Sequence, residues 1–138
     1  MCGFAVLASA DPERPLPHSP AEIDRIRDQL RHRGPDEAGS WTGPERRIVM
    51  AHRRLKVLDL EGGQQPLELR GRYRIVYNGE IYNFRELRDR LRDRGWSFTS
   101  TGDTEVLLAA WIEWGPDCLE RLRGIYAFVA YDARERRL

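Results

Sequence analysis

Apolar runs and alternating apolar and polar positions predict a series of short strands along this chain. Uninterrupted apolar runs are typical of strands buried on both faces, whereas strict alternation is typical of strands with one solvent-facing side. These patterns predict strands at residues 3–8, 48–51, 73–77, 96–99 and 125–131. The last run is rich in β-branched and aromatic side chains and is the most strand-like of them. We therefore expect it to be central in its sheet.

Apolar positions at helical spacing predict helices between these strands. Ser19, Pro20 and Glu22 form a capping box with proline at the first helical position, and the helix that they begin is expected to end at Gly34. Further helices are predicted from a cap at Asn83 to Gly95, from a cap at Asp103 or Thr104 to Gly115, and from residue 116 to residue 122.

Turn residues connect several of the predicted strands directly. Residues 33–36 contain a Gly-Pro pair, residues 61–66 contain a Gly-Gly pair, and Asn78-Gly79 is typical of a tight hairpin turn. Short turns join antiparallel strands, whereas parallel strands need a long crossover connection. The chain is therefore predicted to be an α+β domain of layered antiparallel sheets and helices, rather than a doubly wound parallel fold.

The last residues indicate an incomplete domain. Residues 132–138 are mostly charged and follow the most apolar strand as a hairpin turn without its return strand. A strand this apolar is expected to have a neighbour on each side. We therefore expect residues 2–138 to form one domain that lacks its C-terminal part.

Length, charge and cysteine content exclude several classes of protein. The chain has 138 residues, which suffices for one domain, and its 23 basic and 22 acidic residues nearly cancel. This balance disfavours nucleic-acid binding, because polyanion-binding proteins carry a basic surplus. The apolar run at residues 4–8 is too short for a signal peptide or a membrane span, so we expect a cytoplasmic protein without a membrane partner. The two cysteines and three histidines lack metal-ligand spacing, so neither a disulfide framework nor a metal site is expected.

Cys2 is the first candidate for chemistry, because removal of Met1 would place it at the amino terminus. A free α-amine has a pKa of roughly 7.7–8.0 and can accept the proton of the thiol on the same residue. Nucleophile and base would then come from one residue, without a histidine. The alternative is that Cys2 is a small, buried and inert residue at the start of a strand.

Four other positions could complete a site for an amide substrate. Asn78 and Gly79 are candidates for an oxyanion hole, because a side-chain amide and a glycine N–H can both donate to a developing negative charge. Arg54 and an acid, Asp103 or Glu80, are candidates for binding the two charged groups of a zwitterion. The alternatives are a plain turn at Asn78-Gly79, a solvated arginine on a sheet edge, and a helix cap at Asp103.

A series of short motifs runs along the whole chain, namely Met1–Gly3, Arg31–Asp36, Ala51–Leu55, Gln65–Leu67, Tyr77–Asn83, Gly102–Val106 and Leu122–Phe128. In this order the motifs closely resemble the N-terminal glutaminase domain of glutamine-hydrolysing asparagine synthetases, which are class II glutamine amidotransferases. The His-Arg-Gly-Pro-Asp form of the second motif points to the asparagine-synthetase branch.

The resemblance implies a fold and a role for each candidate residue. The fold would be an αββα four-layer sandwich of the N-terminal-nucleophile hydrolase type. Cys2 would be the nucleophile and its α-amine the base, and Asn78 and the Gly79 N–H would form the oxyanion hole. The substrate glutamine would be held by its α-carboxylate on Arg54 and by its α-ammonium on two acidic side chains, Glu80 and Asp103.

The resemblance also implies partners and leaves the acceptor of the ammonia open. Glutamine would be hydrolysed through a thioester, and ammonia would pass to a synthetase domain that amidates aspartate with ATP and Mg²⁺; the glutaminase domain itself needs no cofactor. That synthetase domain, normally in the same chain, lies outside this sequence, and a homodimer of the parent enzyme is an option. Lys56 stands where many asparagine synthetases have serine, so a related amidotransferase for another carboxylate, such as a peptide or natural product, is an alternative. An inactive fragment that binds glutamine is another.

Overall fold

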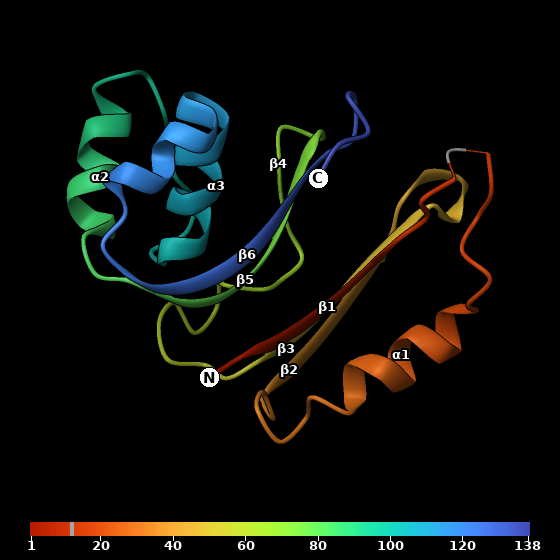
Figure 1. The fold of residues 1–138 in the computed structure, drawn as a ribbon. Helices are drawn as coiled ribbons and strands as arrows, with labels where there is room; N and C mark the ends of the chain where they lie inside the picture. The colour runs from red at the N-terminus through yellow and green to blue at the C-terminus, as the bar shows by residue number, and fades with distance from the viewer. Residues whose placement is uncertain (12) are drawn as a thin grey trace.

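Two antiparallel sheets of three strands each form the centre of the molecule (Figure 1). The computed structural model describes residues 1–11 and 13–138. The first sheet has the order β1-β3-β2 and the second the order β4-β5-β6. Their strands are β1 (Gly3–Ala8), β2 (Glu37–Thr42), β3 (Ile48–Arg54), β4 (Leu67–Leu69), β5 (Tyr73–Ile81) and β6 (Gly124–Asp132).

Helices cover the outer face of each sheet, so the layers run helix, sheet, sheet, helix (Figure 1). Helix α1 (Pro20–Asp28) lies on the first sheet, where Ile23 packs against Val49 and Ala51 of β3. Helices α2 (Phe84–Arg92) and α3 (Asp103–Trp114) lie on the second sheet, and the 3-10 helices are η1 (Pro44–Arg46) and η2 (Gly115–Arg121). The predicted αββα architecture is thereby confirmed.

Period-two alternation in β3 explains how the two sheets stack. Val49 and Ala51 face α1, whereas Ile48 and Met50 share an apolar cluster with Val76 of the second sheet. Because successive side chains of a strand point to opposite faces, one buried strand supplies apolar groups to two layers. All seven residues of β3 are buried: the apolar run at residues 48–51 forms the predicted part, and the strand continues through three buried basic residues to Arg54.

The capping box at Ser19 forms as predicted, but α1 is shorter than predicted. The Glu22 N–H donates to Oγ of Ser19 and the Ser19 N–H donates to the Glu22 carboxylate. The helix ends at Asp28 rather than near Gly34, and single turns follow it. A Cβ on Gly34 would lie 2.4 Å from the carbonyl carbon of Arg53, so the chain leaves the helix early to pass close against β3.

The prediction of a hairpin turn at Asn78-Gly79 is wrong, because both residues lie inside β5. Asn78 pairs with Ala127 and Gly79 with Tyr126 of β6. A Cβ on Gly79 would lie 2.2 Å from the carbonyl oxygen of Ile125, so glycine is required for a close approach between two strands. The sequence pattern correctly indicated that a residue without a Cβ is needed here, but the reason is the close approach of β6 rather than a turn.

The predicted strand at residues 96–99 is also absent from the structure. The Thr99 and Ser100 N–H groups donate to the carboxylate of Glu105, and the Trp96 indole donates to Glu113. Acidic side chains of α3 thus accept hydrogen bonds from backbone N–H groups that, in a sheet, would donate to a neighbouring strand. The segment is therefore an extended connection that carries apolar side chains to the core.

Two predicted helix caps take other roles. The Asn83 side chain precedes α2 but bonds with the Arg121 carbonyl and the Arg123 N–H instead of capping that helix. The N-cap of α3 is Gly102, so Asp103 is the first helical residue and its carboxylate is directed elsewhere. In both cases a hydrogen bond to a segment distant in sequence replaces the local one.

Strand β6 forms where the sequence predicts it, but it is not central among the described residues. It pairs along its length with β5, and a single bridge joins Asp132 to Arg137 on the other side of the turn. Ile125 is 69% exposed accordingly. Within residues 1–11 and 13–138, no helix is both long and apolar enough to cross a membrane.

Candidate active site

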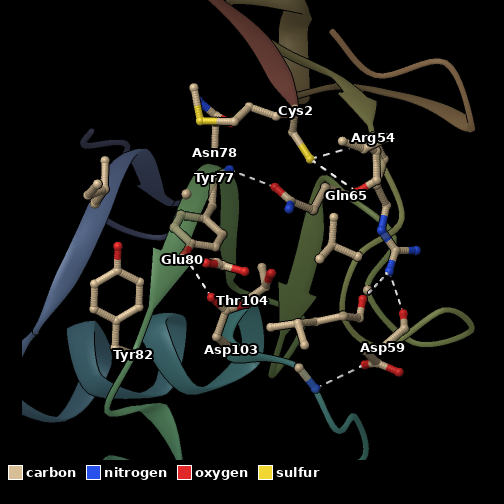
Figure 2. A pocket seen from close by; sticks show the side chains of 18 residues that line it. Cys2, Arg54, Asp59, Gln65, Tyr77, Asn78, Glu80, Tyr82, Asp103 and Thr104 are labelled. Atoms are coloured by element: carbon tan, nitrogen blue, oxygen red, sulfur yellow. Dashed lines mark hydrogen bonds between the residues drawn. The ribbon is translucent and has the colours of Figure 1, made fainter.

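One cavity of ≈ 370 Å³ opens where the ends of both sheets meet the start of α3 (Figure 2). It is lined by the two residues that precede β1, by residues of β3, β5, β6 and α3, and by the loop that follows β3. Every residue that the sequence indicated for the site lies on its wall, namely Cys2, Arg54, Asn78, Gly79, Glu80 and Asp103. The structure thus brings these six residues together, and the roles assigned to them stay predictions.

Cys2 lies half-buried at the start of β1 with its sulfur in the cavity (Figure 2). The Leu55 N–H donates to Sγ at 3.3 Å, and Sγ lies 3.7 Å from the Leu55 carbonyl oxygen. The Cys2 carbonyl accepts from Nε of Arg33 at 3.0 Å. Met1 is 68% exposed at the mouth, where a processing enzyme can reach it.

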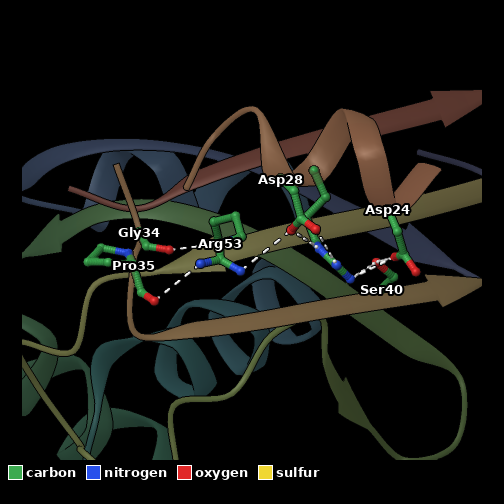
Figure 3. Close-up of polar contacts among 7 residues, drawn as sticks. Asp24, Asp28, Gly34, Pro35, Ser40 and Arg53 are labelled. Carbon is green, nitrogen blue, oxygen red and sulfur yellow. Dashed lines mark hydrogen bonds and ion pairs between the residues drawn. The ribbon is translucent and has the colours of Figure 1, made fainter. Parts of the chain in front are cut away.

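The motif from Arg31 to Asp36 supports this part of the site from outside. Arg53 donates to the carbonyl oxygens of Gly34 and Pro35 and pairs with Asp28 at the end of α1 (Figure 3). These contacts hold the turn after α1 against β3, which places Arg33 beside Cys2. The sequence analysis gives neither Arg33 nor Arg53 a role, and no local pattern indicated one, because their hydrogen bonds reach residues that are distant in the chain.

Arg54 is buried at the end of β3 rather than on a solvated edge, since only 4% of it is exposed. Its guanidinium donates to Glu37 and to the carbonyl oxygens of Leu58 and Asp59. A guanidinium carries five N–H donors, so these three hydrogen bonds leave two donors for a ligand carboxylate. Burial alone would raise the pKa of Glu37, but hydrogen bonds from Lys56 and Arg54 lower that pKa below its ordinary value.

Lys56, the residue that departs from the usual serine, contacts Glu37. Its two neighbours, Leu55 and Val57, line the cavity, and the Lys56 N–H donates to the carboxylate of Asp36 at 2.8 Å. The lysine is therefore part of the charged group around Arg54.

Asn78 lies on β5 opposite the Cys2 side of the cavity (Figure 2). Its Oδ1 is buried and has no hydrogen-bond partner in the part of the chain that the structure describes. The strand is anchored one residue earlier, where the Tyr77 N–H donates to Oε1 of Gln65 at 2.6 Å. Oxyanion stabilisation requires hydrogen-bond donors, and the Asn78 amide can offer its Nδ2 from a strand that lines the same cavity as the Cys2 thiol.

Asp103 and Glu80 differ in how tightly they are held. The Asp103 carboxylate is buried and accepts from the Tyr77 hydroxyl at 2.7 Å and from the Ile81 N–H at 3.0 Å. Burial, together with this carboxylate, raises the pKa of Tyr77, so its hydroxyl stays protonated and keeps donating. Glu80 is exposed at the cavity wall. The two acids therefore offer one buried, hydrogen-bonded carboxylate and one exposed carboxylate at the cavity wall.

His52 lies in β3 between the two sheets, and one of its ring nitrogens contacts the Tyr77 carbonyl at 3.0 Å. Burial lowers the pKa of His52 to about 4, and the hydrogen bond to Tyr77 opposes that shift only in part. The buried ring is therefore neutral at physiological pH, with the contacting nitrogen as the donor.

Acidification is expected to destabilise the fold through His52. The unfolded chain binds a proton at this residue near pH 6.5, whereas the folded chain does so near pH 4. Stability is thus full above pH 6.5 and falls as the pH decreases to 4, by about 3 kcal/mol in all. Urea unfolding of His52→Asn between pH 7 and pH 4 should give a shallower pH slope than the unsubstituted chain. His32→Asn, which alters an exposed ring, is the matched control; equal slopes for all three proteins would contradict the assignment.

Several residues of the site carried no signal that sequence reasoning used. Asp59, Gln65 and Tyr77 all line the cavity, and each bonds to a segment distant in the chain. Gln65 and Tyr77 stand inside motifs that carry the resemblance, and Asp59 stands between the motifs Ala51–Leu55 and Gln65–Leu67. Cys118, by contrast, is a buried core residue as expected.

Comparisons with known proteins agree on one family. The sequence model of a family described as Glutamine amidotransferase domain matches residues 1–138. The chain is 42% identical over 141 residues to glutamine-hydrolyzing asparagine synthetase 3 of Bacillus subtilis, covering 100% of this chain and 22% of that protein. It is 39% identical over 115 residues to asparagine synthetase B of Escherichia coli, covering 83% of this chain and 20% of that protein. The chain therefore spans about a fifth of the length of these relatives.

The fold has solved counterparts. The structure of glutamine phosphoribosylpyrophosphate amidotransferase from B. subtilis superposes with a TM-score of 0.70 at 18% identity, covering 96% of this chain and 35% of that chain. A second structure, described as the allosteric regulatory enzyme of purine biosynthesis, gives a TM-score of 0.68 at 20% identity, covering 96% of this chain and 36% of that chain. At these identities the likeness concerns the fold.

Proposed function

Because the chain belongs to the glutamine amidotransferase domain family, we propose that it hydrolyses the side-chain amide of glutamine to glutamate and ammonia at Cys2. The observation that carries this proposal is the meeting of a thiol, a side-chain amide, an arginine and two acids around one cavity. A nucleophile, donors for an oxyanion and groups for both ends of an amino acid are what this reaction requires.

The first half of the reaction forms a thioester. After loss of Met1, the α-amine of Cys2 takes the thiol proton and Sγ attacks the amide carbon of glutamine. The negative charge on the amide oxygen is met by Nδ2 of Asn78 and the N–H of Gly79. The amine then returns the proton to the nitrogen, the carbon–nitrogen bond breaks, ammonia leaves, and the γ-glutamyl group stays on Sγ.

The second half releases glutamate. The same amine takes a proton from water, and the resulting hydroxide attacks the thioester carbon. The oxyanion again lies at Asn78 and Gly79, the carbon–sulfur bond breaks, and the proton returns to the thiolate. Arg54 holds the α-carboxylate throughout, and the α-ammonium lies between two carboxylates, the buried Asp103 and the exposed Glu80. No step draws on a metal ion or cofactor.

The ammonia is proposed to supply an amide-forming reaction in the cytoplasm. Relatives named glutamine-hydrolyzing asparagine synthetases are several times longer than this chain, which leaves room for a synthetase domain beside the glutaminase domain. We propose aspartate as the acceptor, activated in that further domain with ATP and Mg²⁺. An acceptor with a different carboxylate is the alternative, and competition between aspartate and other carboxylates in the parent enzyme would distinguish the two.

Glutamate release from the purified chain tests the proposal. Intact mass spectrometry first establishes that Met1 is absent, and the protein is then incubated with L-glutamine or, as a control, with L-asparagine. Glutamate and ammonia are expected in equal amounts from glutamine alone, and a γ-glutamyl adduct is expected on the Cys2 peptide in quenched samples. Calorimetric heat without glutamate would instead indicate a domain that binds glutamine without hydrolysing it.

A further inference from the structure

Asp59 connects two segments of the site that are 42 residues apart in the chain. It lies in the loop between β3 and β4, where its Oδ1 accepts from the Gly62 N–H at 3.0 Å. Its Oδ2 accepts from the Thr101 N–H at 3.1 Å and from the Gly102 N–H at 3.2 Å, and Figure 2 shows the second of these bonds. Gly102 is the N-cap of α3 and directly precedes Asp103. One carboxylate therefore joins the loop to the helix that carries the buried acid of the site.

The backbone of Asp59 holds the arginine of the site at the same time. The carbonyl oxygens of Leu58 and Asp59 both accept from Nη2 of Arg54, and the Asp59 carbonyl also accepts from the Gly63 N–H at 3.2 Å. A Cβ on Gly63 would lie 2.3 Å from Nη2 of Arg54, so the loop packs directly against the guanidinium. We call these contacts, together with those of the carboxylate, the Asp59 latch.

Backbone geometry and charge show why an aspartate occupies this position. Asp59 has a φ of 49°, a left-handed conformation that glycine adopts more readily. Burial would raise the pKa of its carboxyl, but the N–H groups of Gly62, Gly102 and Thr101 lower that pKa below its ordinary value. The side chain is therefore ionised, and a negative charge at the start of α3 is favourable. A strained residue with a fully engaged carboxylate is typical of a functional position.

We propose that Asp59 is a positioning residue for glutamine binding, which sets the distance between Arg54 and Asp103 through the Asp59 latch. This inference rests on the proposed function, in which those two side chains bind the α-carboxylate and the α-ammonium of glutamine. The two charged groups of an α-amino acid are a fixed distance apart, so their two binding partners must be held at a matching distance. Asp59 contacts Arg54 through its backbone carbonyl and the start of α3 through its carboxylate, so it reaches both binding groups.

Asp59→Asn tests the proposal with little change in shape. The substitution replaces one acceptor oxygen by an NH₂ group that faces N–H donors, so one side of the latch opens. Because Arg54 and Asp103 act in binding, KM for glutamine should rise about tenfold or more while kcat stays within about twofold. A purely structural role would lower the folded fraction and hence kcat, without a change in KM. Asp89→Asn, an exposed residue with 73% of its side chain accessible, is the matched control and should leave both constants unchanged.

A conservative variant and an exchange measurement complete the test. Asp59→Glu keeps the negative charge and should recover part of the affinity; a KM as high as that of the asparagine variant would overturn the role given to the charge. Amide hydrogen exchange at Gly62, Thr101 and Gly102 should accelerate at least about tenfold in Asp59→Asn. Unchanged exchange, or an unchanged KM, would overturn the proposal.

The exchange measurement separates this proposal from the proposed function. It needs no turnover, so a chain that released no glutamate would contradict the proposed function alone. The hydrogen-exchange rates of the same three amides would then test the Asp59 latch without any measurement of activity.

Discussion

Glutamate release is expected to fall by about 10⁴-fold or more when Cys2 is replaced by alanine, because the variant lacks the attacking sulfur. The sulfur contacts the backbone of Leu55 and is half-buried at a strand start, so its loss should leave the fold unchanged. Glutamine should still bind, since its charged ends are held by other side chains. Glutamate release and calorimetry on the same sample would measure both properties.

Cys118→Ala is the matched control for this prediction. Cys118 is a buried residue of η2, and burial raises the pKa of its thiol to about 11, so it stays protonated and unreactive. Its replacement should lower stability slightly and leave kcat unchanged. A γ-glutamyl adduct on Cys118, or full activity of Cys2→Ala, would contradict the proposed mechanism.

A form of the protein that keeps Met1 provides a second control, because it retains the thiol but not the base. The nitrogen of Cys2 is then part of a peptide bond and cannot accept a proton. This form should be as inactive as Cys2→Ala while its mass differs from the active form by one methionine. Activity in a sample that intact mass spectrometry shows to be unprocessed would require a different base.

Replacement of Asn78 by alanine is expected to lower kcat by about 10²–10³-fold, because one of two donors to the oxyanion is lost. This corresponds to about 3–4 kcal/mol of transition-state stabilisation. KM should change little, since the side chain meets the charge that develops during the reaction rather than the bound substrate. Steady-state kinetics with glutamine would separate the two constants.

Asn83→Ala is the matched control, since it removes the same type of side chain five residues further along. Asn83 bonds with the backbone of residues 121 and 123, so its loss should lower Tm without a change in kcat. If Asn78→Ala kept kcat within tenfold, or raised KM alone, Asn78 would have no part in an oxyanion hole. Gly79 cannot be tested in this way, because any Cβ there would collide with β6 and disturb the sheet.

Local sequence patterns predicted an element correctly where the conformational preference of its residues and their burial favoured the same structure. Strand β1, the capping box of α1, and strand β6 all formed where apolar runs or cap residues indicated them. The same rules failed at Asn78-Gly79 and at residues 96–99, where a local preference competed with contacts to β6 and α3. Turn chemistry indicates which conformations are accessible, and the tertiary partner selects among them.

The residues of the candidate site likewise fall into those that the sequence indicated and those that only the structure revealed. Cys2, Asn78 and Arg54 were found from their chemistry, because each residue type suits one task in amide hydrolysis. Asp59 and Arg33 were not, because each acts through hydrogen bonds to residues more than 25 positions away. No pattern in a single sequence reports such a pairing.

The residue types and their order predicted a layered antiparallel α+β domain and the candidate nucleophile, and the resemblance of the motifs supplied the αββα architecture and the family. Strand pairing and layer stacking decided the rest: that β6 lies at an edge among the described residues, that Arg54 is buried against Glu37, and that Asp59 joins its loop to α3. The physical reason is the separation along the chain over which each kind of interaction acts. Conformational preference and periodicity act over a few residues, whereas the hydrogen bonds that position an active site cross between segments that only the folded chain brings together.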